Sequence, residues 1–489
     1  MKIFYWLLGI ITTTLVGIYI LLFTYMGNGI LKQVIEKEIQ KSTNLTSEFK
    51  TFSLSIHDFE FLLELNPNNT ITVNGDYSLW NRSLDMNYNV DLNDVKSLKE
   101  LFKEEIDTPL HLIGTAVGDS SLLIVEGQSD VSSSKSSFKV ELVAFEAKNI
   151  VFNIKSLKIK EALVILHQPP YSDGELDVLV NISNLSHGLL NGYIDTKISK
   201  GLLNSKYISK AYEFNSIMPY TNFNISTHSI LDGNFVDTSL DLNSNLVNLD
   251  VNKFHYDIEE ESLISDYEVN IHDLDRLYFI SQRHLLGSLK AQGEVKKSED
   301  LDLSIESYVA GGKLNATLHN NKFDAKISNM KSIDILTILK YPKIFDARLN
   351  AVVDYNLESK KGLFDGKLSK GRFTENEAFD LLKKYAQTDV YKEKFTGDVN
   401  AVINADQVIA SLSLHSNRSS IISKGTKIDS QKSLIDSKVE INANGNKVDV
   451  NLKGDINKPN VKINADELIK EEATKVIKKE LGKFLKGFF

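Results

Sequence analysis

Histidine and carboxylate side chains are the residues of this chain with the greatest potential for chemistry. The ten histidines are scattered over 489 residues, and none belongs to an H-E-x-x-H zinc motif. The sequence also lacks a G-x-S-x-G nucleophile elbow, a Walker loop and a dinucleotide fingerprint. His111 and His284 occupy equivalent places in a repeated stretch, which favours packing over metal ligation. We therefore expect no enzymatic activity, no metal site and no cofactor.

Composition narrows the classes of partner further. The net charge is −9, and no basic stripe with interleaved aromatic residues is present, so we expect no nucleic-acid binding. The chain has no cysteine, which excludes disulfides and thiolate metal ligands.

Alternation of apolar and polar residues is the dominant pattern of the chain. From Leu84 to Leu92 every second residue is apolar, and the residues between are Asp or Asn. The stretches Leu349–Leu357 and Val448–Leu452 alternate in the same way, and Asn444-Gly445 is typical of a hairpin turn. The sequence predicts about thirty short antiparallel strands with one apolar face. A sandwich, a barrel or a long curled sheet whose apolar face lines a groove would each satisfy this pattern.

Several segments of the chain occur twice. The stretch DTKISKGLLN from Asp195 recurs as DGKLSKGRFT from Asp365, and His111-Leu112-Ile113-Gly114 recurs as His284-Leu285-Leu286-Gly287 at an offset of 173. Tyr88 recurs as Tyr267 at an offset of 179. The order of the matches is preserved, which predicts a tandem duplication of about 172 residues. The shared Ser-Lys-Gly motif is interpreted as a structural turn between strands in each copy.

Short helical patterns interrupt both copies at matching places. They cover residues 95–105 and 274–283, then 158–166 and 330–339, and finally 375–386 with a weaker counterpart near 205–212.

The N-terminal region predicts a membrane anchor. Residues 3–26 carry no charge, and 24 helical residues are long enough to cross a hydrocarbon core of about 30 Å. A cleaved signal peptide is the alternative, but the apolar run is longer than usual and no A-x-A site follows. Lys2 favours a cytoplasmic N-terminus. An apolar helical stripe in residues 28–42 then predicts a helix that caps the first strands, with a helix on the membrane surface as the alternative.

The C-terminal residues 465–489 predict an amphipathic helix with lysines on one side. Its apolar side is expected to contact a membrane through Ile469, Val476, Ile477, Leu481, Phe484 and Phe488. A helix that covers the edge of the last strand is an equally good interpretation.

These patterns predict five segments. They are a cytoplasmic stub and anchor (1–27), a juxtamembrane helix (28–42), a first strand repeat (43–252), a second strand repeat (253–464) and the C-terminal amphipathic helix (465–489). Each strand repeat is a β-groove repeat in the curled-sheet arrangement, which the resemblance described next implies.

The arrangement resembles a known family. An anchor followed by LKQVIEKEIQKSTN, alternating strands, and GDINKPNVKIN with Gly454, Pro459 and Val461 before a terminal helix is similar to the AsmA-like proteins of Gram-negative envelopes, the TamB- and YdbH-type proteins. The resemblance covers the whole architecture. It implies a mainly β protein with a long curled antiparallel sheet, anchored in the inner membrane and projecting into the periplasm. It also implies transport of phospholipids between the inner and outer membranes, or a role in outer-membrane homeostasis.

Apolar residues of the alternating strands are the expected lining of a lipid groove. They are Leu84, Met86, Tyr88, Val90, Leu176, Val178, Val180, Tyr267, Val269, Ile271, Leu349, Ala351, Val353, Leu412 and Leu414. The expected partners are phospholipids, the inner membrane and, through the C-terminal region, the outer membrane or a protein in it. A periplasmic scaffold for envelope components with a closed sandwich core is the alternative function.

Overall fold

The computed structural model describes residues 19, 22–102, 108–185, 188–341, 343–375, 380, 383, 389–429, 431–455 and 459–464. These residues form 26 strands, one helix of 19 residues and several short helices, so the protein is mainly β as predicted. The chain divides into two compact units. Unit 1 contains the residues up to Tyr212 together with Tyr220–Ser244, and unit 2 contains Glu213–Pro219 together with the residues from Asn245 onward.

The described part of unit 1 contains twelve strands, and that of unit 2 contains fourteen. Those of unit 1 are β1 (Ser47–Leu54), β2 (Asp58–Leu65), β3 (Asn69–Ser78), β4 (Ser83–Leu92), β5 (Leu110–Asp119), β6 (Leu122–Ser129), β7 (Lys135–Val143), β8 (Glu146–Lys158), β9 (Ser172–Asn184), β10 (Leu190–Leu203), β11 (Asn222–Gly233) and β12 (Phe235–Ser244). Those of unit 2 are β13 (Asn248–Asp257), β14 (Ser262–Ile271), β15 (Leu289–Lys297), β16 (Leu301–Val309), β17 (Gly312–His319), β18 (Lys322–Lys331), β19 (Phe345–Asn356), β20 (Lys361–Phe373), β21 (Phe395–Asn404), β22 (Gln407–His415), β23 (Ser419–Asp429), β24 (Leu434–Ala443), β25 (Asn446–Asp455) and β26 (Asn460–Asn464).

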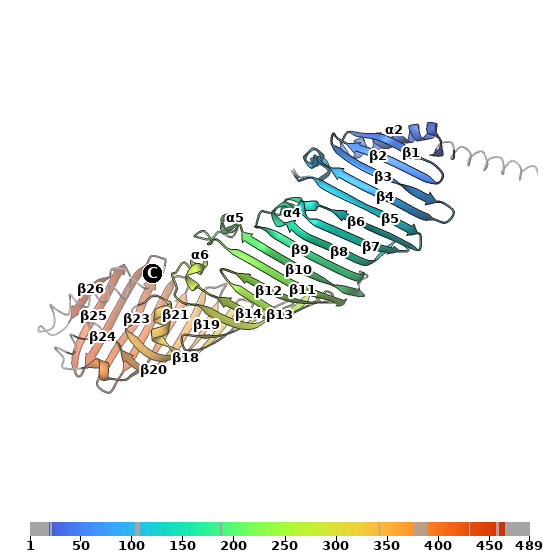
Figure 1. Cartoon of the computed structure of the whole chain (residues 1–489). Coiled ribbons are helices and arrows are strands. Elements are labelled where there is room, and N and C mark those ends of the chain that lie inside the picture. Colours follow the sequence, from blue (N-terminus) through green and yellow to red (C-terminus); the bar gives the residue numbers. More distant parts are fainter. Residues whose placement is uncertain are drawn as a thin grey trace, which may run out of the picture. The chain divides into compact units, whose positions relative to one another are not determined.

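Within each unit every strand pairs antiparallel with the next strand of the chain. Among the described residues no pairing joins the first strand of a unit to its last, so each sheet is open. Figure 1 shows the strands of each unit as a single layer.

The two ends of the strands are built differently. The helices α2 (Tyr25–Thr43), η1 (Val95–Leu98), α3 (Lys99–Phe102), η2 (Val131–Ser133), α4 (Ile159–Ile165) and α5 (Ser205–Ala211) belong to unit 1, and η3 (Leu274–Leu277), α6 (Tyr278–Ser281), α7 (Ser332–Ile338) and η4 (Val390–Lys392) to unit 2. All of them except α2 lie where one strand ends and the next begins, always at the same end of the strands in their unit. We call this end the helix edge (Figure 1) and the opposite end, where short turns connect the strands, the hairpin edge.

Most predicted helices are present in the described chain. Residues 28–42 lie within α2, residues 95–105 and 274–283 contain η1–α3 and η3–α6, and α4, α7 and α5 fall in the other predicted stretches. The predicted helix at 375–386, most of residues 3–26 and the whole C-terminal segment 465–489 lie outside the described residues. No helix of the described chain is long and apolar enough to cross a membrane.

The order of elements repeats along the chain. The series from β4 through η1, α3, β5–β8, α4, β9 and β10 recurs as β14, η3, α6, β15–β18, α7, β19 and β20. One predicted correspondence is wrong, however. His111 lies in β5, whereas His284 precedes β15; Gly114 corresponds to Gly293, because each glycine pairs with the repeated tyrosine, Tyr88 or Tyr267. The difference in residue number between equivalent positions therefore remains 179 through β5. His111 and His284 consequently do not occupy equivalent positions in the structure.

The duplicated Ser-Lys-Gly motif is a β-bulge and not a turn between strands, so that interpretation is also wrong. It lies inside β10 and β20, where Lys200 and Lys370 have left-handed backbones with φ of 54° and 55°. The pairing register is interrupted directly around each lysine, between Ile198 and Gly201 in β10 and between Leu368 and Gly371 in β20. Because of the extra residue, apolar side chains before and after the bulge lie on the same face of the sheet.

Aromatic rings explain the glycine of this motif. A Cβ atom on Gly201 would stand 2.7 Å from Cε2 of Phe223, and a Cβ atom on Gly371 would overlap the ring of Phe345. The bulge therefore brings backbone and ring together at a place where only glycine leaves enough room.

Gly371→Ala should destabilise unit 2, and Gly201→Ala unit 1, by about 1–3 kcal/mol each, because the added methyl group overpacks the ring. The midpoint of urea unfolding measures the effect. Gly29→Ala in α2 is the control, since no atom lies within 4 Å of its Cβ position and alanine favours the helix. A Gly371→Ala protein that unfolds at the wild-type urea concentration would contradict this account.

Helix α2 covers the free edge of β1. The Asn28 side chain accepts a hydrogen bond from Leu54 N at 2.8 Å and donates one to Leu54 O at 2.9 Å. At the other end of the strand, Glu36 Oε1 accepts from Phe49 N at 2.7 Å. Side chains of the helix thus replace a neighbouring strand, which protects an edge that would otherwise pair with another chain.

Asn28→Ala and Glu36→Ala should loosen β1 by about 1 kcal/mol each, because each leaves an edge amide without its partner. Hydrogen exchange should then accelerate at Leu54 in the first variant and at Phe49 in the second. Glu38→Ala, on the exposed side of the same helix, is the control and should change neither amide. Equal exchange in all three variants would show that α2 does not satisfy this edge.

The buried cores of both units lie at the helix edge. In unit 1, Leu45, Leu65 and Leu92 pack with Val95 and Leu98 of the η1 connection. In unit 2, Phe345, Phe373, Phe395, Leu414 and Ile421 pack with Val390 of η4. Towards the hairpin edge the apolar side chains become half-buried, so burial falls along the strands away from the helices.

Candidate functional site: the apolar face of the sheets

The seven predicted lining residues of unit 1 lie on one face of its sheet. On β4, Tyr88 is paired with Val73 and Gly114, and its neighbours Leu84, Met86 and Val90 share its side of the strand. On β9, Leu176, Val178 and Val180 share one side in the same way. Pairing carries this face from β4 to β9 through apolar residues such as Ala116, Val125, Phe138 and Phe152.

The eight predicted residues of unit 2 likewise share one face of that unit. Tyr267, Val269 and Ile271 lie on β14, Leu349, Ala351 and Val353 on β19, and Leu412 and Leu414 on β22. Alternate residues from β14 to β23 connect them, for example Val353 with Ala325 and Phe364. We call this side of each sheet the apolar face, and the other side the polar face.

Exposure divides the predicted residues into two groups. All seven in unit 1 are half-buried, as are Tyr267, Val269, Ile271, Val353 and Leu412. Leu349, Ala351 and Leu414 are buried, and Leu414, with 3% of its surface exposed, belongs to the core around Phe395. The half-buried residues are the ones that an apolar ligand could touch, whereas these three contribute to the core.

Two repeated tyrosines lie across the apolar face. Tyr88 Oη donates a hydrogen bond to Glu126 O at 2.9 Å, and Tyr267 Oη donates to Ser304 O at 2.8 Å. Each phenol reaches over the adjacent strand, where Gly114 or Gly293 leaves room for it. Burial raises the pKa of both phenols above its ordinary value, with the nearby Glu126 carboxylate adding to the effect at Tyr88.

The alternation of the sequence predicted both tyrosines as lining residues but not the hydrogen bonds of their hydroxyl groups. The apolar-face residues of β2, β7 and β8, among them Phe61, Phe138 and Phe152, were not predicted. The alternation in DFEFLLEL, residues 58–65, carried that signal.

Removing both hydroxyls, as Tyr88→Phe with Tyr267→Phe, should lower the stability of each unit by about 1 kcal/mol at neutral pH, because a hydrogen bond is lost. The raised pKa adds a pH dependence. Neutral phenol is favoured in the fold, so this stabilisation is complete below the unfolded pKa of about 10 and disappears as the pH rises through the folded pKa. The double variant should therefore lose less stability than wild type over that alkaline range in urea titrations. If the double variant lost as much stability as wild type over this pH range, the assigned role of the two phenols would be contradicted.

Two histidines of the polar face are partners of aspartates. Across paired strands, His228 Nδ1 lies 2.6 Å from Asp195 Oδ1, and His319 Nδ1 lies 2.7 Å from Asp302 Oδ1. The hydrogen bond and charge of Asp302 raise the pKa of His319. Such exposed pairs contribute little to stability.

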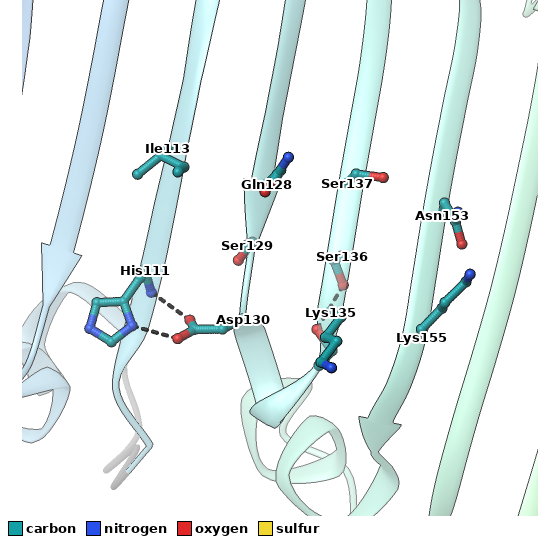
Figure 2. A pocket seen from close by; sticks show the side chains of 11 residues that line it. His111, Ile113, Gln128, Ser129, Asp130, Lys135, Ser136, Ser137, Asn153 and Lys155 are labelled. Atoms are coloured by element: carbon teal, nitrogen blue, oxygen red, sulfur yellow. Dashed lines mark hydrogen bonds and ion pairs between the residues drawn. The ribbon is translucent and has the colours of Figure 1, made fainter.

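A polar hollow of about 490 Å³ near the helix edge of unit 1 contains a further pair (Figure 2). His111 Nδ1 lies 2.5 Å from Asp130 Oδ2, and His111 Nε2 lies 3.3 Å from Asn93 Oδ1. Burial would raise the pKa of the Asp130 carboxyl, but the hydrogen bonds and charge of His111 outweigh it and hold that pKa below its ordinary value. Both ring nitrogens of His111 are thus engaged by side chains, and no nucleophile of the described chain is hydrogen-bonded to them.

A second hollow, of about 650 Å³, lies on the polar face of unit 2 beside Val352, Leu363 and Lys326. In the described part of the chain, no group of three or more His, Asp or Glu side chains is arranged to hold a metal ion. The half-buried apolar face, which both units share, is therefore the candidate site.

Comparison with known proteins adds no assignment. No family model, no curated protein and no solved structure matches the chain.

Proposed function

We propose that this chain is a membrane-anchored envelope protein whose apolar face carries the acyl chains of phospholipids between the inner and outer membranes. The observation that supports it is the half-buried apolar face, which runs from strand to strand within each unit and is not covered by a second layer of described residues. Each CH₂ group removed from water on such a surface contributes about 0.8 kcal/mol. Headgroups would remain in water beside the sheet.

The rest of the proposal follows the resemblance to AsmA-like proteins. Residues 3–26 would anchor the chain in the inner membrane with the N-terminus in the cytoplasm, and the sheets would form a groove in the periplasm. The C-terminal segment 465–489 would contact the outer membrane or a protein in it.

A periplasmic scaffold is the second candidate function. The buried cluster around Phe395 in unit 2 favours it, because Leu414, a predicted lining residue, is sealed there by protein. The described strands of each unit, however, do not form the two packed sheets of a sandwich core by themselves.

Val353 and Val352 provide a matched pair that tests lipid binding. They are adjacent on β19, with Val353 half-buried on the apolar face and Val352, 53% exposed, on the polar face. An ionised carboxylate among acyl chains costs about 3 kcal/mol. Val353→Asp should therefore reduce local lipid occupancy by roughly a hundredfold, whereas Val352→Asp should leave it near wild type.

The measurement is photo-crosslinking to phospholipid in the membrane-reconstituted full chain. A benzophenone amino acid at Phe364, the partner of Val353 on β20, would report occupancy in wild type and in both variants. Thermal unfolding would show whether each variant remains folded. Equal crosslinking in the two variants would reject the apolar face as the lipid site, and a loss confined to Val352→Asp would indicate the polar hollow instead.

A further inference from the structure

The hairpin edge of unit 1 exposes large apolar side chains. Trp80, between β3 and β4, has 95% of its surface exposed, and Phe145, between β7 and β8, has 70%. Ile56 and Leu189 are exposed in the β1–β2 and β9–β10 turns. The remaining two hairpins begin their second strands with exposed Leu122 and Phe235, so every hairpin at this edge presents an apolar side chain.

The equivalent edge of unit 2 has a different chemistry, although its strands and turns follow the same plan. Its turns contain Glu259–Glu261, Glu299–Asp300, Asn320–Asn321, Glu358–Lys360 and Ala405–Asp406. Leu357 in the β19–β20 turn and Leu434 at the start of β24 are the large apolar side chains exposed in a described turn of that edge or at the first residue after one. The fold therefore does not require exposed apolar side chains at every hairpin of this edge. Where they gather, as in unit 1, an exposed apolar surface of this kind indicates an interaction site.

The chain enters unit 1 at this same edge. Asn28, in the first turns of α2, is hydrogen-bonded to Leu54 at the end of β1 that leads into the Ile56 turn. Tyr25 and Met26, at the start of α2, are largely exposed. The uncharged stretch 3–26 thus joins the sheet beside the apolar turns, which places them next to the segment whose length suits a bilayer.

We propose that the hairpin edge of unit 1 rests on the surface of a lipid bilayer, with Trp80 and Phe145 in the interfacial layer. Tryptophan is enriched at that depth because its ring is apolar and its N–H can remain hydrated. Neighbouring strands are about 4.8 Å apart, so the turns of Trp80 and Phe145 are separated by about 19 Å, which allows separate points of contact. The carboxylates in the unit 2 turns would lose hydration in the same layer. The inference uses the proposed anchoring but does not require acyl chains on the apolar face.

Fluorescence of the full chain in phosphatidylcholine vesicles tests this without altering the turns. Trp6 and Trp80 are the two tryptophans, so a Trp6→Phe protein reports on Trp80 alone. We expect emission shifted to shorter wavelength than in water and quenched by lipids brominated near the headgroup, with less quenching by bromines near the chain end.

A cysteine-free chain offers an independent measurement with an internal control. Phe145→Cys and Ser359→Cys place one thiol in a turn of unit 1 or of unit 2, and each is labelled with an environment-sensitive dye. Lipids carrying a shallow nitroxide should quench the dye at position 145 and leave the dye at position 359 unchanged.

Water-like, unquenched signals from both Trp80 and the dye at position 145 would overturn the proposal. Shielding from water without lipid quenching would also overturn it, because the edge would then contact protein. These measurements are separate from crosslinking at the apolar face. If the protein failed to bind acyl chains but Trp80 were quenched by lipid, the proposed transfer function would be rejected and the membrane contact would stand.

Discussion

One constraint governs the whole structure: the apolar residues of each strand must keep the same phase as those of its neighbours. Side chains alternate with period two, so a slip of one residue would turn a complete apolar set towards solvent. Where an extra residue interrupts the pattern, a bulge absorbs it. Ser156 and Asn329, both left-handed, hold equivalent bulges in β8 and β18, and their amides bond to the equivalent side chains Asp177 and Asn350. The same bulges therefore recur at equivalent strands of the two units.

The second organising feature is the difference between the two strand ends. Helical connections lie at one edge, where their side chains complete a buried core. At the other edge only short turns connect the strands, and the apolar side chains there are less buried. The buried clusters at the helix edge can therefore stabilise the strands while the middle of the apolar face remains half-buried. A surface that binds a flexible apolar ligand needs this combination, because a fully closed core leaves no contact area and an unsupported layer would not hold its register.

The polar side chains discussed above stabilise the pairing of strands. The amide of Asn28 and the carboxylate of Glu36 act as a substitute strand for β1, and the aspartates beside His111, His228 and His319 belong to cross-strand pairs. Sheet geometry thus explains these three histidines. Differences between the repeats are more informative than similarities, since the strand plan accounts for the similarities. The hairpin edge carries exposed apolar side chains at every hairpin of unit 1, whereas most described turns of unit 2 carry polar or acidic residues on the same plan of strands.

The sequence by itself determined the class of structure, the face to which each predicted lining residue belongs and the places of most helices, because these depend on local periodicity. Leu84, Met86 and Tyr88 share a face as soon as their strand forms. The tertiary structure decided what depends on pairing across the chain. It showed that Lys200 and Lys370 form bulges, that His111 and His284 are not equivalent, and that Leu414 is buried while Val353 remains accessible. Alternation states which side a residue faces, but only the neighbouring strands, often tens of residues away, decide what covers it.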